Sequence, residues 1–471
     1  MTWEAIVGIS LLFLSTPRLK FFYFDSGLRW QYILVFSFLA SFFMTPICRW
    51  IAFRLKILDT PDWRKIHHQT TPLLGGVAIY VAFTSALLLN GIFLTGMKFL
   101  WLGGTLIFIM GLWDDIRPLP ALLKFVLQIL ISLLVIIFGD LQITFFYHAA
   151  WAPLINIPIT LLWIVGLTNA MNFFDGIDGL ATAMSFMGAL FLGILAFQTH
   201  QPALGWFAVA ILGACMGFFP YNFRFGHSAL LFLGDAGSTF LGFTLAGLAI
   251  LGKWSNTSHF VSISAPILIF GVLIFDMIYV NLSRAKNKQA KTFFQFLTCV
   301  NKDHLHHRLI FMGFARKEVV FVISTMSACL GVSALIIINQ KFMDALLGLF
   351  QAVMIIGLIV ALMWKGRDRI PKDGDRRMMR RRRDDRIEID AVPRSRVERP
   401  GKDGETLHNI SYSFPPFEEG PPFEEGPPVE EGPLRRTGAK TSARSPRYSA
   451  PRKERRISSP LEEGNSGKGK H

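Results

Sequence analysis

The sequence contains few charged residues for its length. Only 17% of its 471 residues are Asp, Glu, Lys or Arg, whereas 52% are hydrophobic and 44 are phenylalanine. A soluble protein of this size needs more polar surface than these residues supply. The composition therefore argues against a soluble all-α protein and predicts an integral membrane protein.

Cysteine is also scarce. The four cysteines form no Cys-x-x-Cys pair, so the sequence indicates neither a disulfide framework nor a cysteine metal site. A cleavable signal peptide is not evident either. Glu4 precedes the apolar run 6–14, and no small-residue cleavage site follows that run.

Long apolar runs fill most of the chain. About 20 apolar residues cross a bilayer as a helix, and a helix satisfies its own backbone hydrogen bonds in lipid. We therefore expect an all-α polytopic membrane protein with eleven spans, at 32–50, 74–91, 98–113, 121–138, 152–170, 180–198, 203–219, 238–252, 260–281, 319–338 and 343–364.

The spans divide the chain into an N-terminal segment (1–31), a transmembrane domain (32–364) and a C-terminal tail (365–471). The apolar run 3–15 is short for a crossing, so it is expected either in the membrane interface or as an extra span. In the tail, three near-copies of a six-residue Pro-Glu-rich unit occupy 415–432. Such short repeats cannot bury a core, so the tail is expected to be disordered. We interpret it as a tether, with docking to a protein partner as the alternative.

Basic residues are distributed unevenly among the loops. They gather in loops 51–73 and 282–318, whereas most other loops are short and nearly uncharged. The positive-inside rule places both basic loops and the C-terminus in the cytoplasm. The net charge of +15 lies largely beyond Met363. On a membrane protein, this basic tail is expected to face anionic lipids rather than nucleic acid.

The unusual polar clusters all fall on the face that this topology makes cytoplasmic. Acidic groups at the helix ends of a membrane protein are candidates for function, because leaving them in lipid is costly. Four of these residues recur every three positions, which predicts one face of a helical stretch. Gly176 and Gly179 would leave room there for a phosphorylated ligand. A capped helix end with solvated carboxylates is the alternative. The four residues are Asn169, Asn172, Asp175 and Asp178.

Two further acidic sites lie at expected helix ends. Asp235 is followed by Ser238 and Thr239, which are expected to cap a helix whose N-terminus would favour phosphate. An ordinary loop–helix junction explains the same residues. The adjacent pair Asp114–Asp115 suits a general base or a magnesium-linked role, with a solvated helix end as the alternative.

Three histidines and an arginine fall within the segment Asp303–Arg308. Three nearby histidines are compatible with zinc. However, His306 and His307 are adjacent and face different directions on a helix, and hard magnesium prefers oxygen ligands. We therefore favour a basic cluster that binds diphosphate over a metal site.

These motifs occur in an order that resembles a known family, the polyprenyl-phosphate N-acetylhexosamine-1-phosphate transferases. The likeness runs from about residue 50 to 315 and is closer to the undecaprenyl-phosphate GlcNAc-1-phosphate transferases than to the phospho-MurNAc-pentapeptide translocase. It departs at 291–300 and between Asn222 and Asp235, regions that would face the sugar or the nucleotide. The motifs that carry it are Asp59–His67, Pro72, Gly75–Gly76, Asp114–Asp115, Asn169–Leu180, Phe232–Ser238 and His304–His307.

The resemblance implies a reaction. An N-acetylhexosamine 1-phosphate would pass from a UDP-sugar such as UDP-GlcNAc to undecaprenyl phosphate, with release of UMP, in the presence of Mg²⁺ or Mn²⁺. The reaction would take place at the cytoplasmic face of a bacterial inner membrane. It would be the first membrane step of a cell-envelope polysaccharide such as O-antigen lipopolysaccharide. The resemblance is also compatible with a homodimer, and it implies no nucleic-acid partner.

The resemblance further implies roles for individual residues. Asp235 would hold the metal, with Asp175 close to it as an alternative further ligand. Asp114 or Asp115 would handle the proton on the lipid phosphate, and Asp178 with Phe232 would hold the uracil. Asp114, Asp115, Asp175 and Asp178 would be the catalytic residues. The residues expected to bind substrate are Lys65, Asn169, Asn172, Phe232, His304, His306, His307 and Arg308.

Three other functions are less consistent with the sequence. A transporter would place acids near the bilayer midplane, whereas these acids cluster at one interface. The CDP-alcohol phosphotransferases carry a longer paired-Asp signature with an Ala-Arg pair, which the segment Asp175–Leu180 does not match. A catalytically inactive scaffold would not be expected to retain an acid at every one of these positions.

Overall fold

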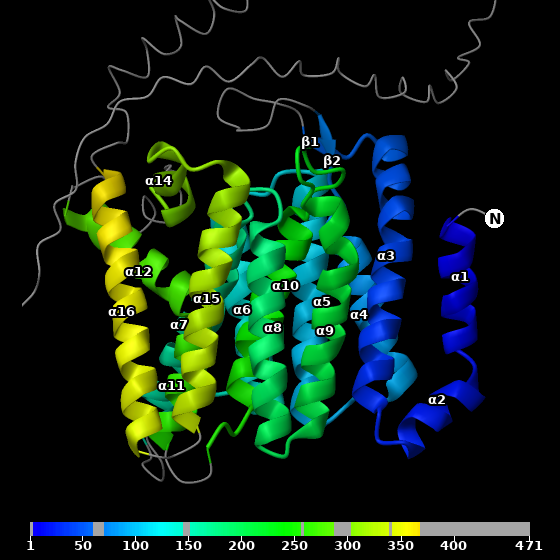
Figure 1. Ribbon diagram of the computed structural model, residues 1–471, viewed down its shortest axis with the longest axis horizontal. Helices are drawn as coiled ribbons and strands as arrows, with labels where there is room; N and C mark the ends of the chain where they lie inside the picture. Colours follow the sequence, from blue (N-terminus) through cyan, green and yellow to red (C-terminus); the bar gives the residue numbers. More distant parts are fainter. Residues whose placement is uncertain are drawn as a thin grey trace, which may run out of the picture. The chain divides into compact units, whose positions relative to one another are not determined.

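The protein is described from a computed structural model, which places residues 3–59, 70–144, 151–255, 259–286, 303–338 and 342–367. Almost all of them lie in helices, and this confirms the predicted all-α class (Figure 1). Among these residues, the one sheet joins β1 (Leu58–Asp59) to β2 (Thr71–Pro72) in antiparallel register. The predicted tail beyond Arg367 and the predicted substrate residue Lys65 lie outside the described residues.

Nine helices in the described part of the chain are long and apolar enough to cross a membrane, so the chain is a multi-pass membrane protein. Each overlaps one of the predicted spans. A tenth predicted span overlaps α4 (Gly75–Asn90), an apolar helix of 16 residues. The nine helices are α3 (Arg29–Leu55), α5 (Thr95–Ile116), α6 (Ala121–Gly139), α7 (Ala152–Phe174), α8 (Leu180–Gln198), α9 (Pro202–Asn222), α10 (Gly234–Leu251), α15 (Arg316–Ile338) and α16 (Phe342–Arg367).

The predicted span 260–281 is not one straight helix. It is divided into α11 (His259–Ile269) and α12 (Gly271–Lys286), which meet at an angle of 75°. Pro266 lies inside α11, where it has no N–H for the helical ladder. A proline of this kind is a common cause of a sharp bend in an apolar helix.

The N-terminal segment forms α1 (Trp3–Leu14) and α2 (Pro17–Asp25). The 12 residues of α1 extend about 18 Å at the helical rise, which is less than the thickness of a hydrocarbon core. The hydroxyl of Tyr32 on α3 donates to the carbonyl of Leu14 (2.8 Å) and fixes the end of α1.

Glycines allow three helices to meet closely around the start of α10. A Cβ added to Gly76 at the start of α4 would lie 2.3 Å from the backbone nitrogen of Gly237. A Cβ added to Gly111 of α5 would lie 2.7 Å from the backbone oxygen of Asp235. Small residues of this kind allow backbones to approach within a membrane. The end of α5, with its two aspartates, is therefore held against the start of α10.

Candidate active site at the end of the helix bundle

Carboxylates from three helices converge at one end of the bundle. Asp114 and Asp115 lie in the last turn of α5, Asp175 directly follows α7, and Asp235 lies in the first turn of α10. The side-chain amide of Asn172 donates to Asp235 Oδ1 (3.0 Å) and links α7 to α10. Four acids from distant parts of the sequence are thereby gathered at one end of the bundle.

Asp115 closes the N-terminus of α10. Its two carboxylate oxygens accept the backbone N–H groups of Asp235 (2.8 Å) and Ala236 (3.0 Å). A helix N-terminus favours negative charge, because its first N–H groups have no partner within the helix. Gly234 has a φ of +77°, and a Cβ there would lie 2.6 Å from Asp115 Oδ2, so only glycine fits this junction.

The expected caps of α10 were wrong. The hydroxyls of Ser238 and Thr239 donate backwards to the carbonyls of Gly234 (2.9 Å) and Asp235 (2.6 Å) within the helix. These hydroxyls therefore bond to carbonyl groups in the first turn of α10 and do not cap the free N–H groups of that turn. Asp115, which comes from another helix, takes the capping role.

Lys124 supplies a cation to the cluster. Its ammonium group, on the first turn of α6, forms ion pairs with Asp114 and with Asp235 Oδ2, the latter at 3.0 Å. The other oxygen of Asp114 accepts the backbone N–H of Leu119 (2.6 Å). Lys124 was not among the residues predicted from the sequence. The available signal was that it is the one charged residue in the apolar run 121–138.

Asp175 is the carboxylate with the least compensation. Loss of water around the carboxyl, together with the charges of Asp235 and Asp115, raises its pKa well above the usual range. The N–H of Gly234 donates to it and opposes that shift in part. Asp175 therefore resists ionisation unless a further positive charge is brought near.

The prediction that four polar residues share one helical face was wrong. α7 ends at Phe174, and α8 begins at Leu180 after Gly179, whose φ of +82° breaks the helix. Only Asn169 and Asn172 lie on α7. Asn169 Nδ2 donates to Gln128 Oε1 of α6 (2.7 Å). Asp178 lies in the turn that follows α7, where it accepts the backbone N–H of Ala229 (3.0 Å).

The predicted histidine cluster lies beside the end of α7. α14 (Leu305–Phe311) begins after His304, whose ring stacks on Phe173 with 5.0 Å between ring centroids. The rings of His306 and Phe174 form a T-shaped pair with 5.7 Å between their centroids. A Cβ on Gly176 would lie 3.1 Å from His306 Nε2, so the room that this glycine leaves is taken by the imidazole. Figure 1 shows α14 at the same end of the bundle as β1 and β2.

His306 is buried, and within the described residues neither of its ring nitrogens has a hydrogen-bond partner. Burial, followed by the neighbouring His307 and His304, holds its pKa well below the usual range. A buried polar group without a partner is costly and is often completed by a ligand. Both ring nitrogens of His306 are therefore buried polar atoms that the described side chains leave unsatisfied.

Two other predicted substrate residues have backbone roles. The buried guanidinium of Arg308 donates to the backbone carbonyls of Asp303 and Met363 and lies over the ring of Tyr279 at 5.0 Å. The backbone N–H of Phe232 donates to the carbonyl of Pro72 (3.0 Å), which joins β2 to the segment before α10. Both residues support the frame around the carboxylates.

Residues 97–253, which include all four carboxylates of the cluster, match the model of glycosyl transferase family 4. A probable undecaprenyl-phosphate N-acetylglucosaminyl 1-phosphate transferase of Bacillus subtilis is 31% identical over 334 residues, which is 69% of this chain and 89% of that protein. The chain belongs to glycosyl transferase family 4.

Two further relatives of this family 4 member are more distant. A decaprenyl-phosphate N-acetylglucosaminephosphotransferase of Mycolicibacterium smegmatis is 28% identical over 70% of this chain and 87% of its own length. An undecaprenyl-phosphate alpha-N-acetylglucosaminyl 1-phosphate transferase of Escherichia coli K12 is 26% identical over 63% and 80%. The family resemblance read from the sequence motifs is confirmed.

The donor atoms of the family 4 site fit a hard cation. In the described part of the chain, no three acidic, histidine or cysteine side chains already converge on one point. However, Asp114 and Asp235 already share one cation, the ammonium of Lys124. Carboxylate oxygens are the ligands that Mg²⁺ prefers, and a cation brought near Asp175 would favour the ionised form of that carboxyl.

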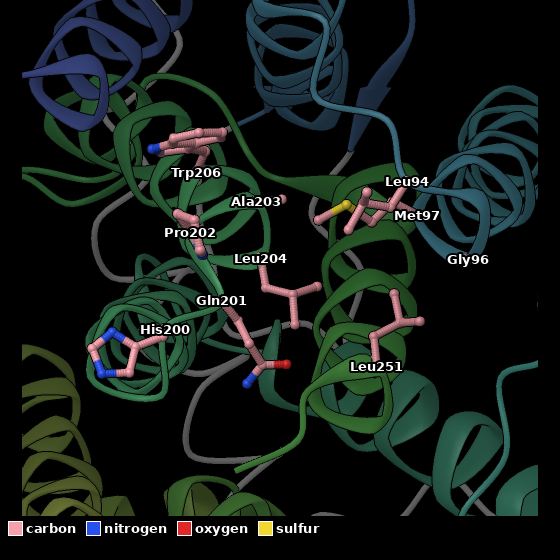
Figure 2. A pocket seen from close by; sticks show the side chains of 10 residues that line it. All are labelled: Leu94, Gly96, Met97, His200, Gln201, Pro202, Ala203, Leu204, Trp206 and Leu251. Carbon is pink, nitrogen blue, oxygen red and sulfur yellow. The ribbon is translucent and has the colours of Figure 1, made fainter. Parts of the chain in front are cut away.

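An apolar cleft of about 450 Å³ lies elsewhere (Figure 2). It opens at the beginning of α5, whereas Asp114 lies near the end of that 22-residue helix. At the helical rise, the separation is about 30 Å. The cleft is therefore distinct from the carboxylate site. Its lining includes Leu94, Met97, His200, Leu204, Trp206 and Leu251.

Proposed function

We propose that this family 4 member transfers N-acetylglucosamine 1-phosphate from a UDP-sugar to undecaprenyl phosphate, with release of UMP. The observation that carries the proposal is the group of four carboxylates and one lysine at the meeting point of α5, α6, α7 and α10. The names of the relatives support the sugar phosphate and the lipid acceptor. The basic loops support a cytoplasmic site in a bacterial inner membrane, and the reaction would begin cell-envelope polysaccharide synthesis.

The chemistry is a phosphoryl transfer. An oxygen of the polyprenyl phosphate forms a bond to the β-phosphorus of the UDP-sugar, and the bond from that phosphorus to the bridging oxygen breaks. UMP leaves with the bridging oxygen and its electron pair. Catalysis of this kind depends mainly on positioning and on neutralising the charge of the transferred group.

Asp235 and Asp175 are the residues that would hold Mg²⁺, or Mn²⁺ in its place, because both supply carboxyl oxygens and a cation would relieve the repulsion between them. The bound ion would neutralise the diphosphate oxygens. Lys124 orients Asp114 and Asp235 through their shared ion pairs. Both oxygens of Asp115 accept backbone N–H groups of α10, and those of Asp114 accept the N–H of Leu119 and the ammonium of Lys124, so either acid is proposed to take a proton from the lipid phosphate.

His306 lies against Gly176, the residue that follows Asp175. Its two nitrogens lack partners within the described residues, and a diphosphate oxygen would supply one. Asp178 and Phe232 border the same end of the bundle and are proposed to contact the nucleotide. The sugar identity rests on the relatives alone.

The decisive experiment measures UMP release by the purified protein in detergent with undecaprenyl phosphate, Mg²⁺ and a panel of UDP-sugars. We expect UMP only when lipid, metal and UDP-N-acetylglucosamine are all present, and we expect its loss in Asp235→Asn. A folded protein that releases no UMP from any donor, beside an active relative, would contradict the proposal and favour a transporter or a scaffold.

A further inference from the structure

Asp276, a buried acid on α12, contacts the beginning of α14, the helix that carries the predicted histidine cluster. Asp276 is 0% exposed, and its Oδ2 lies 2.7 Å from His304 Nδ1. Its Oδ1 accepts the backbone N–H of Leu305 at 2.7 Å. A carboxylate buried within an apolar helix is expensive, so its place there calls for a reason.

We propose that Asp276 is a positioning residue for the transfer reaction: it sets the tautomer of His304 so that Nε2 carries no hydrogen and accepts a hydrogen bond from an O–H group of the substrate. The inference rests on the proposed function. An ionised carboxylate can only accept hydrogen bonds. His304 Nδ1 must therefore carry the hydrogen that Asp276 receives, and Nε2 is the nitrogen that remains.

Neighbouring aromatic rings also fix the orientation of the His304 imidazole. It stacks on Phe173 at 5.0 Å, and it lies parallel to the ring of His306 at 6.0 Å with an angle of 8°. Phe173 is two residues before Asp175. Asp276 is therefore connected through one imidazole to the end of α7, beside the carboxylates. Partners that fix the tautomer of a functional histidine in this way are well known in metal and hydrolase sites.

A second link between the same segments makes the inference testable. Arg284, eight residues after Asp276 on α12, donates to Asp303 Oδ1 (2.7 Å) and Oδ2 (2.8 Å). Positions eight apart are offset by about 80° around a helix, so both can lie within one broad face. This ion pair anchors the residue before His304 without touching the imidazole. Removing this ion pair would therefore test the anchoring of α14 without changing the hydrogen bond that sets the tautomer of His304.

The test is Asp276→Asn in the full-length protein. The amide oxygen can still accept the N–H of Leu305, which places the amide nitrogen against His304 Nδ1. The amide then donates where the carboxylate accepted, and the ring must move its hydrogen to Nε2. We expect the melting temperature to stay near that of the wild type, while kcat for UMP release falls at least about 10-fold and KM for the UDP-sugar changes less. The ¹⁵N NMR signals of His304, assigned by comparison with His304→Gln, should change from the Nδ1–H to the Nε2–H pattern.

Arg284→Gln is the matched control, because it removes a buried link between the same two elements. Its His304 signals should keep the wild-type pattern, and its kcat should fall less than about 3-fold. An Asp276→Asn protein with unchanged His304 signals or wild-type kcat would overturn the inference. An equal loss of kcat in both variants would also overturn it, since anchoring alone would then explain the effect. A wild-type protein without UMP release would instead count against the proposed function, and the NMR comparison would still test the tautomer.

Discussion

Replacing Lys124 with methionine removes the cation that Asp114 and Asp235 share. At 3.0 Å between Lys124 Nζ and Asp235 Oδ2, and an effective dielectric constant of about 20, the attraction is about 5 kcal/mol before desolvation is counted. Removing one partner of a buried ion pair costs about 3–5 kcal/mol, because the other charge is left alone. The Lys124 and Asp235 side chains are 29% and 33% exposed, so water relieves part of that cost. We expect a loss of about 2–3 kcal/mol in the free energy of unfolding.

The loss is measured by denaturant unfolding of Lys124→Met in detergent, beside Lys98→Met. Lys98 is an exposed lysine near the other end of α5, so its replacement should change stability by less than about 0.5 kcal/mol. UMP release by Lys124→Met should fall at least about 100-fold, because the two acids lose their orientation and the diphosphate loses a neighbouring cation.

Addition of Mg²⁺ to metal-free protein sharpens the test. Ligands that bind only the folded state stabilise it. Lys124→Met should therefore gain more stability from Mg²⁺ than the wild type does, because its carboxylates no longer have lysine as a competing cation. A Lys124→Met protein with wild-type stability and wild-type UMP release would refute this account of the site.

Two further predictions concern Asp175 and Gly76. Because the pKa of Asp175 is raised in the folded state, metal-free wild-type protein should lose stability as pH rises above the ordinary Asp range near about 4. Asp175→Asn should flatten that slope in thermal unfolding between pH 5 and 8, melt higher than the wild type at pH 8, and release no UMP. Gly76→Val should disrupt the contact with Gly237 and lower the melting temperature, whereas Gly166→Ala, which meets no atom within 4 Å, should be tolerated.

Much of the fold could be predicted because lipid imposes simple requirements on sequence. Nine predicted spans correspond to long apolar helices, since a run of about 20 apolar residues has few other stable conformations in a bilayer. The bend between α11 and α12 was missed because average hydrophobicity does not respond to one proline. Pro266 was present in the run 260–281 and was the available signal.

The acids of the site could be identified, but their partners could not. Asp235 and Asp115 are 120 residues apart, and the link between them depends on how α5 packs against α10. Capping rules consider neighbours in sequence, and so they assigned the role to Ser238 and Thr239. Lys124 and Asp276 were overlooked for a similar reason. Each is a lone charge in an apolar run, and its importance is visible only where another helix brings an opposite charge to it.

The four carboxylates of the cluster are stabilised in different ways. Asp115 is balanced by the N-terminus of α10, and Asp114 by Lys124 and a backbone N–H. Asp235 shares Lys124 with Asp114 and accepts one hydrogen bond from the side-chain amide of Asn172. Asp175 has one backbone N–H against several negative neighbours. Asp175 is therefore the least compensated of these carboxylates, and His306, beside Gly176, adds two ring nitrogens without partners among the described residues. A cation bound with a diphosphate would meet both needs at once, which a transporter with acids at the bilayer midplane would not require.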